Sequence, residues 1–303
     1  YICFNQYHSS FFAFVCFFPM SALSALSSAA TAILVMRNSL GQNCIRGGGM
    51  ELPRAEFARI LPKRTQYALI PSTVYRSSAP DGAVSTVALA ECERMLRSTD
   101  AMRHNHSVFV GGDRMTSICT VLASLKVHGN KFRLLWLDAH ADIHASKHSH
   151  GMVVNTLFNH AYAGIPRLLP SQIMYVGLRS TDPAEDDFIR RWKIRTITAR
   201  DFRKNEMGSL RRIADFTRGA NVHASLDIDV IDPAFMRSTA TPAPQGLHPD
   251  QLLRILGTIE SASSNYYATD IKEYNPNPKT TEDDPSRQTM RSIFSFLLGG
   301  DEA

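Results

Sequence analysis

The chain has 303 residues, of which 44% are hydrophobic and 20% are charged, as in an ordinary soluble globular protein. Its net charge is +5, and the basic side chains are densest between residues 190 and 212. Aromatic residues are not interleaved with them as a base-stacking surface would need, so we expect a solvated face and no nucleic-acid partner. The five cysteines are scattered without a CxxC spacing, which favours reduced thiols and a cytoplasmic location over a disulfide framework.

The first part of the chain differs in composition from the rest. Residues 1–30 begin with Tyr1 and contain no acidic residue, Lys or Arg, so they lack the charges of a secretory signal or a transit peptide. Pro19 and the neighbouring serines disfavour a membrane span, and we expect no membrane partner. We expect translation to begin at Met20, with residues 1–30 a disordered or spurious extension before a single domain over 31–303.

Apolar runs of strand length alternate with segments of helical periodicity along the rest of the chain. This alternation predicts βαβ units, and therefore an α/β fold with a mostly parallel sheet covered by helices on both faces. The clearest helical segments are 84–97, 116–127, 183–192 and 249–259. The predicted strands are 31–36, 66–70, 106–110, 132–137, 172–177, 194–198, 222–228 and 266–272.

Two of these runs end in carboxylates. Asp138, His140 and Asp142 follow one run, and Asp227 and Asp229 end another about ninety residues later. Alternation along a strand would place each set on one side, and ligands of a parallel sheet gather beyond the carboxyl ends of its strands. Such a crowd of carboxylates needs a compensating cation, because unpaired buried charges are costly. The ligand types suit a divalent metal such as Mn²⁺.

Further motifs, together with these two, resemble those of the ureohydrolase (arginase and agmatinase) family, and they cover nearly all of residues 31–299. The resemblance implies an arginase-like three-layer αβα fold with a central, mostly parallel eight-stranded sheet. It also implies a small-molecule guanidino substrate and a homo-oligomer, either a trimer or a hexamer. The matching segments are 38–42 with 46–53, 110–113, 150–151, 177–185, 239–242 and 272–276.

The resemblance implies that two Mn²⁺ ions per chain hydrolyse L-arginine to L-ornithine and urea. Asp142 would take the proton of the attacking hydroxide, His150 would act as proton shuttle, and Glu273 would pair with the substrate guanidinium. The implied metal ligands are Asp138, His140, Asp142, Asp227 and Asp229. The implied substrate contacts are Asp182, His144, Thr241 and Glu273.

The chain departs from the family pattern at one metal ligand. After Gly111-Gly112-Asp113 the family has a His on the first metal, called the A metal, whereas this chain has Arg114, which has no lone pair to donate. Arg114 could fold into the vacated A site as a fixed cation and leave one metal. Alternatively, it could swing out to solvent, with His144 or His148 as replacement ligand.

The loop before His150 is a second departure. Residues 143–149 are fewer than in arginases and lack the Ser-Gly-Asn that reads the substrate carboxylate, although Lys147 offers a charge there. Three hypotheses follow. The first is an arginase-type hydrolase, the second a catalytically weak or inactive arginase-like protein with an incomplete metal site. The third is a hydrolase of another guanidino or formimino compound, although the His150-Gly151 pair disfavours the formiminoglutamase branch.

Overall fold

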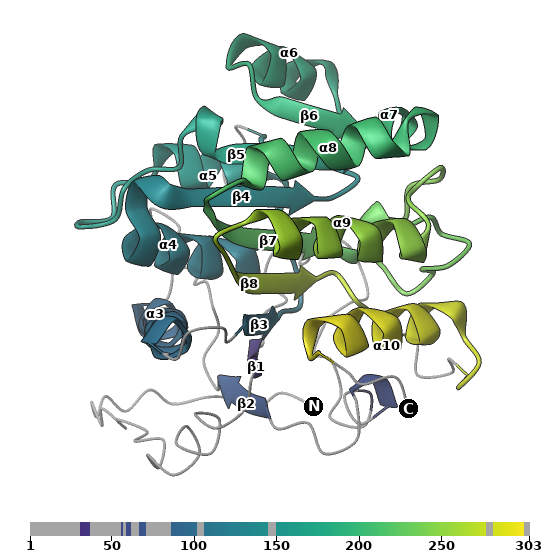
Figure 1. Ribbon diagram of the computed structural model, residues 1–303, viewed down its shortest axis with the longest axis horizontal. Helices are drawn as coiled ribbons and strands as arrows, with labels where there is room; N and C mark the ends of the chain where they lie inside the picture. The colour runs from purple at the N-terminus through teal and green to yellow at the C-terminus, as the bar shows by residue number, and fades with distance from the viewer. Residues whose placement is uncertain are drawn as a thin grey trace, which may run out of the picture.

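The computed structural model describes residues 31–36, 56, 59–61, 67–70, 86–101, 106–144, 150–276 and 281–299 (Figure 1). The predicted extension over 1–30 and the motif segments over 38–53 lie outside the described residues. Within them, no helix is both long enough and apolar enough to cross a lipid bilayer.

A single sheet organises the described chain, with the strand order β2-β1-β3-β8-β7-β4-β5-β6. Every neighbouring pair is parallel. Each predicted apolar run forms one of its strands, so these predictions are confirmed. The strands are β1 (Thr31–Met36), β2 (Tyr67–Ile70), β3 (His106–Val110), β4 (Phe132–Leu137), β5 (Ile173–Leu178), β6 (Arg195–Thr198), β7 (Asn221–Asp227) and β8 (Asn265–Lys272).

Helices cover both faces of this sheet, as Figure 1 shows, which confirms the predicted αβα layers. The helices α3, α4 and α5 pack on one face, and α8, α9 and α10 pack on the other. Their bounds are α3 (Thr86–Ala101), α4 (Thr116–His128), α5 (Val153–Asn159), α6 (Pro183–Arg191), α7 (Ala199–Lys204), α8 (Glu206–Thr217), α9 (Pro249–Ala262) and α10 (Pro285–Leu297).

Strand β4 shows how the sequence builds the two layers of the core. Its side chains alternate between faces, because successive residues of a strand point to opposite sides. Phe132, Leu134 and Trp136 join the apolar cluster beneath α3, α4 and α5. Leu135 and Leu137 join the cluster beneath the helices of the other face. Apart from the half-buried Arg133, β4 is therefore apolar, as is typical of parallel strands with helices on both faces.

The order of the strands creates a switch point between β7 and β4. From β4 the chain proceeds outward to β5 and β6, and it then returns to place β7 and β8 between β4 and β3. The connections after β4 and β7 therefore leave in opposite directions, and open α/β sheets bind their ligands at such a switch point, beyond the carboxyl ends of the strands. The loops after β3, β8, β7 and β4 lie side by side there.

The basic stretch between residues 190 and 212 is exposed, as predicted. Arg191, Lys193, Arg200, Lys204 and Arg211 all have exposed side chains. They lie on or beside α6, α7 and α8, and so form part of a solvated helical surface.

Gly177 allows β5 to pass close to the loops that carry the acidic residues. Its φ is +98°, and a Cβ there would overlap Val230 Cγ2 and lie 3.3 Å from the Asp138 carbonyl oxygen.

We expect Gly177→Ala to lower the free energy of unfolding by about 2–3 kcal/mol, through this overlap and the unfavourable φ. Urea denaturation measures the loss. Gly257→Ala is the matched control, because its nearest neighbour would be Phe296 at 3.9 Å and Ala is the better helix former. Equal stabilities of the two variants would contradict this prediction.

Candidate metal centre

The expected acidic residues converge at the switch point, but not by alternation along strands. Strand β4 ends at Leu137, so Asp138, His140 and Asp142 lie in the loop that follows it. Asp229 lies in a 3-10 turn, η5 (Ile228–Val230), directly after β7. The expectation that strand alternation would align these side chains is therefore wrong, because the chain leaves the pleated conformation at each strand end.

Local hydrogen bonds fix the two acidic loops. The carboxylate of Asp138 accepts a hydrogen bond from the His140 backbone N–H at 2.8 Å, and that of Asp227 accepts one from the Asp229 N–H at 2.9 Å. An Asp that accepts from the backbone two residues further on closes a tight turn. The Asp-x-His and Asp-x-Asp spacings thus turn the chain so that both side chains of each pair lie close to Arg114.

Two residues of the candidate site have a left-handed backbone conformation. Asp142 has a φ of +51° and Glu273 has a φ of +66°. Residues other than Gly rarely adopt this conformation, and such outliers concentrate at functional sites. Glu273 directly follows β8, and its backbone N–H donates to the Gly112 carbonyl at 2.7 Å. The strained turn therefore anchors Glu273 against the loop after β3.

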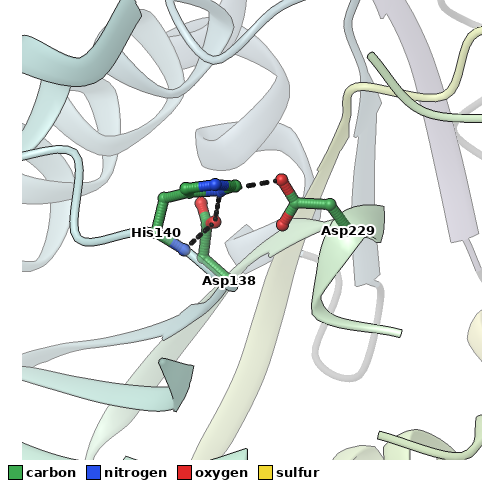
Figure 2. A group of neighbouring side chains, drawn as sticks. All are labelled: Asp138, His140 and Asp229. Atoms are coloured by element: carbon green, nitrogen blue, oxygen red, sulfur yellow. Dashed lines mark hydrogen bonds and ion pairs between the residues drawn. The ribbon is translucent and has the colours of Figure 1, made fainter. Parts of the chain in front are cut away.

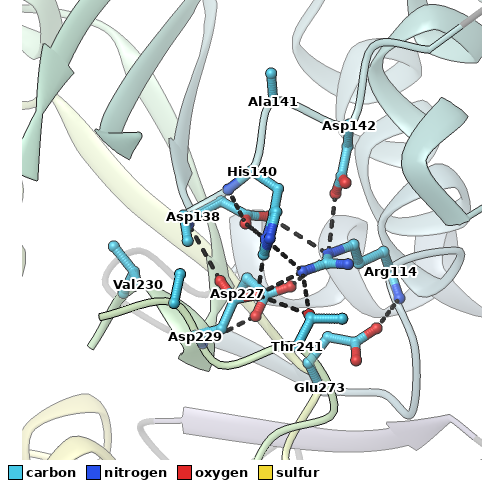
Figure 3. A network of polar contacts seen from close by, with 12 residues as sticks. Arg114, Asp138, His140, Ala141, Asp142, Asp227, Asp229, Val230, Thr241 and Glu273 are labelled. Atoms are coloured by element: carbon cyan, nitrogen blue, oxygen red, sulfur yellow. Dashed lines mark hydrogen bonds and ion pairs between the residues drawn. The ribbon is translucent and has the colours of Figure 1, made fainter. Parts of the chain in front are cut away.

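Arg114 occupies the centre of the acidic group (Figure 3). Its Nε lies 2.8 Å from Asp227 Oδ2, 3.2 Å from Asp142 Oδ2 and 3.8 Å from Asp138 Oδ2. Only 2% of the residue is exposed. The alternative that Arg114 swings out to solvent is therefore wrong, because four buried carboxylates attract the guanidinium more strongly than water does.

The other end of the guanidinium contacts a second set of groups. Arg114 Nη2 lies 2.5 Å from Asp229 Oδ2 and 2.9 Å from His140 Nδ1, and it donates to Thr241 Oγ1 at 3.0 Å. The backbone N–H of Arg114 donates to Glu273 Oε1 at 3.2 Å. Arg114 thus lies in the loop after β3, and its side chain and backbone together contact residues that end or follow β4, β7 and β8.

Burial, with a smaller contribution from neighbouring negative charges, raises the pKa values of three acids of the site. Burial raises the pKa of Asp227 to about 6, with a further contribution from the charge of Asp229. Burial also raises the pKa of Glu273 to about 8, although Arg114 opposes this. The pKa of Asp142 is raised well above its usual range, again chiefly by burial. Arg114 alone therefore does not compensate the acidic group fully.

The pKa of His140 is also raised, but by its acidic neighbours rather than by burial. Burial would lower its pKa, but the hydrogen bonds and charges of Asp138 and Asp229 outweigh burial and raise the pKa to about 10. Figure 2 shows the three side chains facing one another. Their ligand atoms lie within 4.8 Å of one another, which is close enough to hold one metal ion. Imidazole and carboxylate oxygens suit Mn²⁺.

The remaining predicted residues separate into two places. Thr241 lies at the centre, where its hydroxyl donates to Asp229 Oδ2 at 3.2 Å. His144 and Asp182 lie apart from it, with His144 Nε2 3.2 Å from Asp182 Oδ2 and 3.8 Å from Glu185 Oε1. His144 therefore lies beside Asp182 and not at Arg114. The alternative in which His144 replaces the missing metal ligand is wrong. His148 and the side chain of His150 lie outside the described residues.

Comparison with known proteins now decides the family. A model of the "Arginase family" matches residues 76–299. The chain belongs to the arginase family. The arginase of Entamoeba histolytica is 28% identical over 222 residues, which are 67% of this chain and 73% of that protein. The arginase of Neurospora crassa is 29% identical over 209 residues, but these are only 58% of its length. The crystal structure of the Entamoeba arginase with L-ornithine has a TM-score of 0.66 at 26% identity, and the alignment covers 89% of this chain and 98% of that one.

A buried lysine of the arginase-family site was not singled out from the sequence. Lys272, the last residue of β8, has 0% exposure, and its Nζ lies 3.8 Å from Asp138 Oδ2. The Nζ donates to Ser225 Oγ at 2.8 Å and lies 3.5 Å from the ring centroid of Trp136. A lysine at the end of a predicted buried strand, directly before Glu273, was the signal that could have identified it.

A second buried polar network supports the sheet behind the site. Asp270 of β8 accepts hydrogen bonds from the hydroxyls of Ser117, Thr120 and Ser225, at 2.8 to 2.9 Å. His223 Nε2 lies 2.9 Å from Asp270 Oδ2, the oxygen that Thr120 also contacts. Burial would raise the pKa of Asp270, but the hydrogen bond and charge of His223 outweigh burial and lower it to about 2. This carboxylate therefore remains ionised inside the core and links β7, β8 and α4.

Proposed function

We propose that this chain is a manganese-dependent hydrolase of a guanidino compound, with L-arginine to L-ornithine and urea as the first candidate reaction. The observation that carries the proposal is the buried group of Asp138, His140 and Asp229, whose ligand atoms are close enough to hold one ion. Asp138 Oδ2 and Asp142 Oδ2 are buried and accept no hydrogen bond, and the cationic nitrogens of Arg114 and Lys272 stay 3.2 to 3.8 Å from them. The residues present therefore fit one divalent metal.

The residues around the group have roles that match such a reaction. A bound divalent cation supplies Lewis acidity, which makes water a nucleophile near neutral pH. Asp142, with its raised pKa, accepts a proton in the buried site. A substrate guanidinium beside Glu273 favours the ionised carboxylate and is held by it.

We assign the α-amino end of the substrate to Asp182 and His144. These two residues lie together, and about two fifths of each side chain's surface is exposed, as expected of groups that meet a ligand from solvent. His150 remains the proposed proton shuttle on the resemblance alone. The cytoplasmic location and the trimeric or hexameric assembly also remain predictions.

Arg114 favours a second candidate, an arginase-like protein without hydrolase activity. Its guanidinium lies among the carboxylates that would bind a second metal, so the reaction loses one of the two cations that orient and activate water. For the first candidate, the same contact predicts a slow reaction rather than none.

Urea release tests the proposal. The purified protein is assayed with L-arginine and with agmatine, each with added Mn²⁺ and after chelation by EDTA. We expect slow release that depends on Mn²⁺ and is faster with L-arginine, whose carboxylate agmatine lacks. Release from neither compound would overturn the proposal and leave the second candidate. Release that survives chelation would contradict the metal dependence.

A further inference from the structure

The centre contains two organic cations that a two-metal site would not need. Arg114 lies among Asp142, Asp227 and Asp229, and its Nε is 2.8 Å from Asp227 Oδ2. Lys272 also approaches Asp138, with its Nζ 3.8 Å from Asp138 Oδ2. A guanidinium has no lone pair and cannot be a ligand, so no metal ion fits at the position that Arg114 holds.

Both cations are held in place by more than their charge. Nη2 of Arg114 donates to Thr241 Oγ1, and its Nε is fixed between two carboxylates (Figure 3). Lys272 donates to Ser225 Oγ and lies over the ring of Trp136, where the π-electrons favour a cation. Neither side chain reaches solvent, because Arg114 is 2% exposed and Lys272 is 0% exposed. Moving either out of the site would require unpacking the core.

The charges then balance with a single metal. The four aspartates Asp138, Asp142, Asp227 and Asp229 carry four negative charges when ionised. Arg114 and Lys272 supply two positive charges, and one divalent ion supplies the other two. A second divalent ion would leave an excess of two positive charges in a buried site, which is costly.

We propose that Arg114 and Lys272 are built-in cations that replace the second metal, so that the centre binds one divalent ion, at Asp138, His140 and Asp229. The proposal rests on the proposed function in assuming a metal there. On binding, the ion displaces Arg114 Nη2 from His140 and Asp229, whereas Arg114 Nε keeps its contacts with Asp142 and Asp227.

Metal stoichiometry and electron paramagnetic resonance test this without substrate. The full chain is equilibrated with excess Mn²⁺ and its bound metal is counted. We expect one ion per chain with the spectrum of an isolated Mn²⁺. Arg114→His should bind a second ion, and the double variant Arg114→His, Lys272→Met should bind it more tightly, because Lys272 no longer adds a positive charge. Both variants should show the altered spectrum of an exchange-coupled pair. Two coupled ions in the parent, or none at millimolar Mn²⁺, would overturn the proposal.

A folding control and a single variant complete the test. Circular dichroism establishes that the variants fold, and Lys272→Met alone provides a second comparison if the double variant does not. We expect this single variant to remain at one ion, because Arg114 still fills the position. A second ion in Lys272→Met would overturn the role of Arg114. A parent that binds one isolated ion yet releases no urea would refute the proposed function while supporting this inference.

Discussion

Arg114→His is expected to increase manganese-dependent urea release by about 10²-fold, measured as initial rate at saturating L-arginine. The imidazole can be a ligand where the guanidinium cannot, and a second metal contributes several kcal/mol to stabilising the transition state. Arg114→Lys keeps a cation and supplies no comparable ligand, so it should stay near the parental rate. Arg211→His, at an exposed position on α8, controls for nonspecific effects of a new histidine.

Binding of a second metal to Arg114→His should also change the melting temperature of this variant. Without Mn²⁺, Arg114→His should melt below the parent, because removing one partner of a buried ion pair costs about 3–5 kcal/mol. Added Mn²⁺ should restore the melting temperature, since a ligand that binds only the folded state stabilises it. A variant that Mn²⁺ neither stabilises nor activates would show that the acidic residues around Arg114 do not bind a second metal.

Asp270→Asn is expected to lower the free energy of unfolding by about 3–5 kcal/mol, measured by urea denaturation at pH 7. The buried carboxylate is the partner of His223 and accepts hydrogen bonds from the hydroxyls of Ser117 and Thr120. An amide carries no charge to pair with the imidazole, and one of its two polar atoms is a donor that faces other donors. Asp283→Asn, at an exposed position before α10, is the matched control and should change stability little.

The Asp270 effect should also depend on pH in a defined window. The pKa of Asp270 is lowered in the fold from 3.8 to about 2. Its charge therefore stabilises the fold above about pH 4, by about 2 kcal/mol, and this contribution is lost as the pH falls from 4 towards 2. The stability difference between parent and Asp270→Asn should narrow by that amount over this range and stay constant above pH 5. A difference that is independent of pH would mean that the pKa of Asp270 is the same in the folded and the unfolded chain.

The strands of the sheet could be predicted from the sequence alone, because the apolar patterns that indicate them are local. The buried strands are continuous apolar runs, and helices with clear periodicity separate many of them, so their ranges were predictable to within a residue or two. Four helices, α5, α7, α8 and α10, were not predicted from the sequence. Helices α5 and α7 are short, and the stability of α8 and α10 depends on their packing against the sheet. The segments 38–53 lie outside the described residues, so their predicted loop is not tested.

The candidate site was predictable in its members but not in its geometry. The spacing of Asp138, His140 and Asp142 indicated a metal-type group, but the argument from strand alternation failed because these residues follow the strand. Lys272 was overlooked, since only the pairing of β8 with β7 and the packing of Trp136 show that it faces Asp138. His144 was expected to contact substrate, and its position beside Asp182 agrees with that prediction without testing it.

The sequence by itself determined the α/β class, the positions of the strands and the residues with metal-ligand chemistry, because periodicity and side-chain type are properties of the chain. Only the tertiary structure decided which way Arg114 points. A long basic side chain can reach solvent or a buried anion equally well on stereochemical grounds. The choice is made by four carboxylates that come from two separate strand ends, and their combined field exists only once β4 and β7 lie side by side.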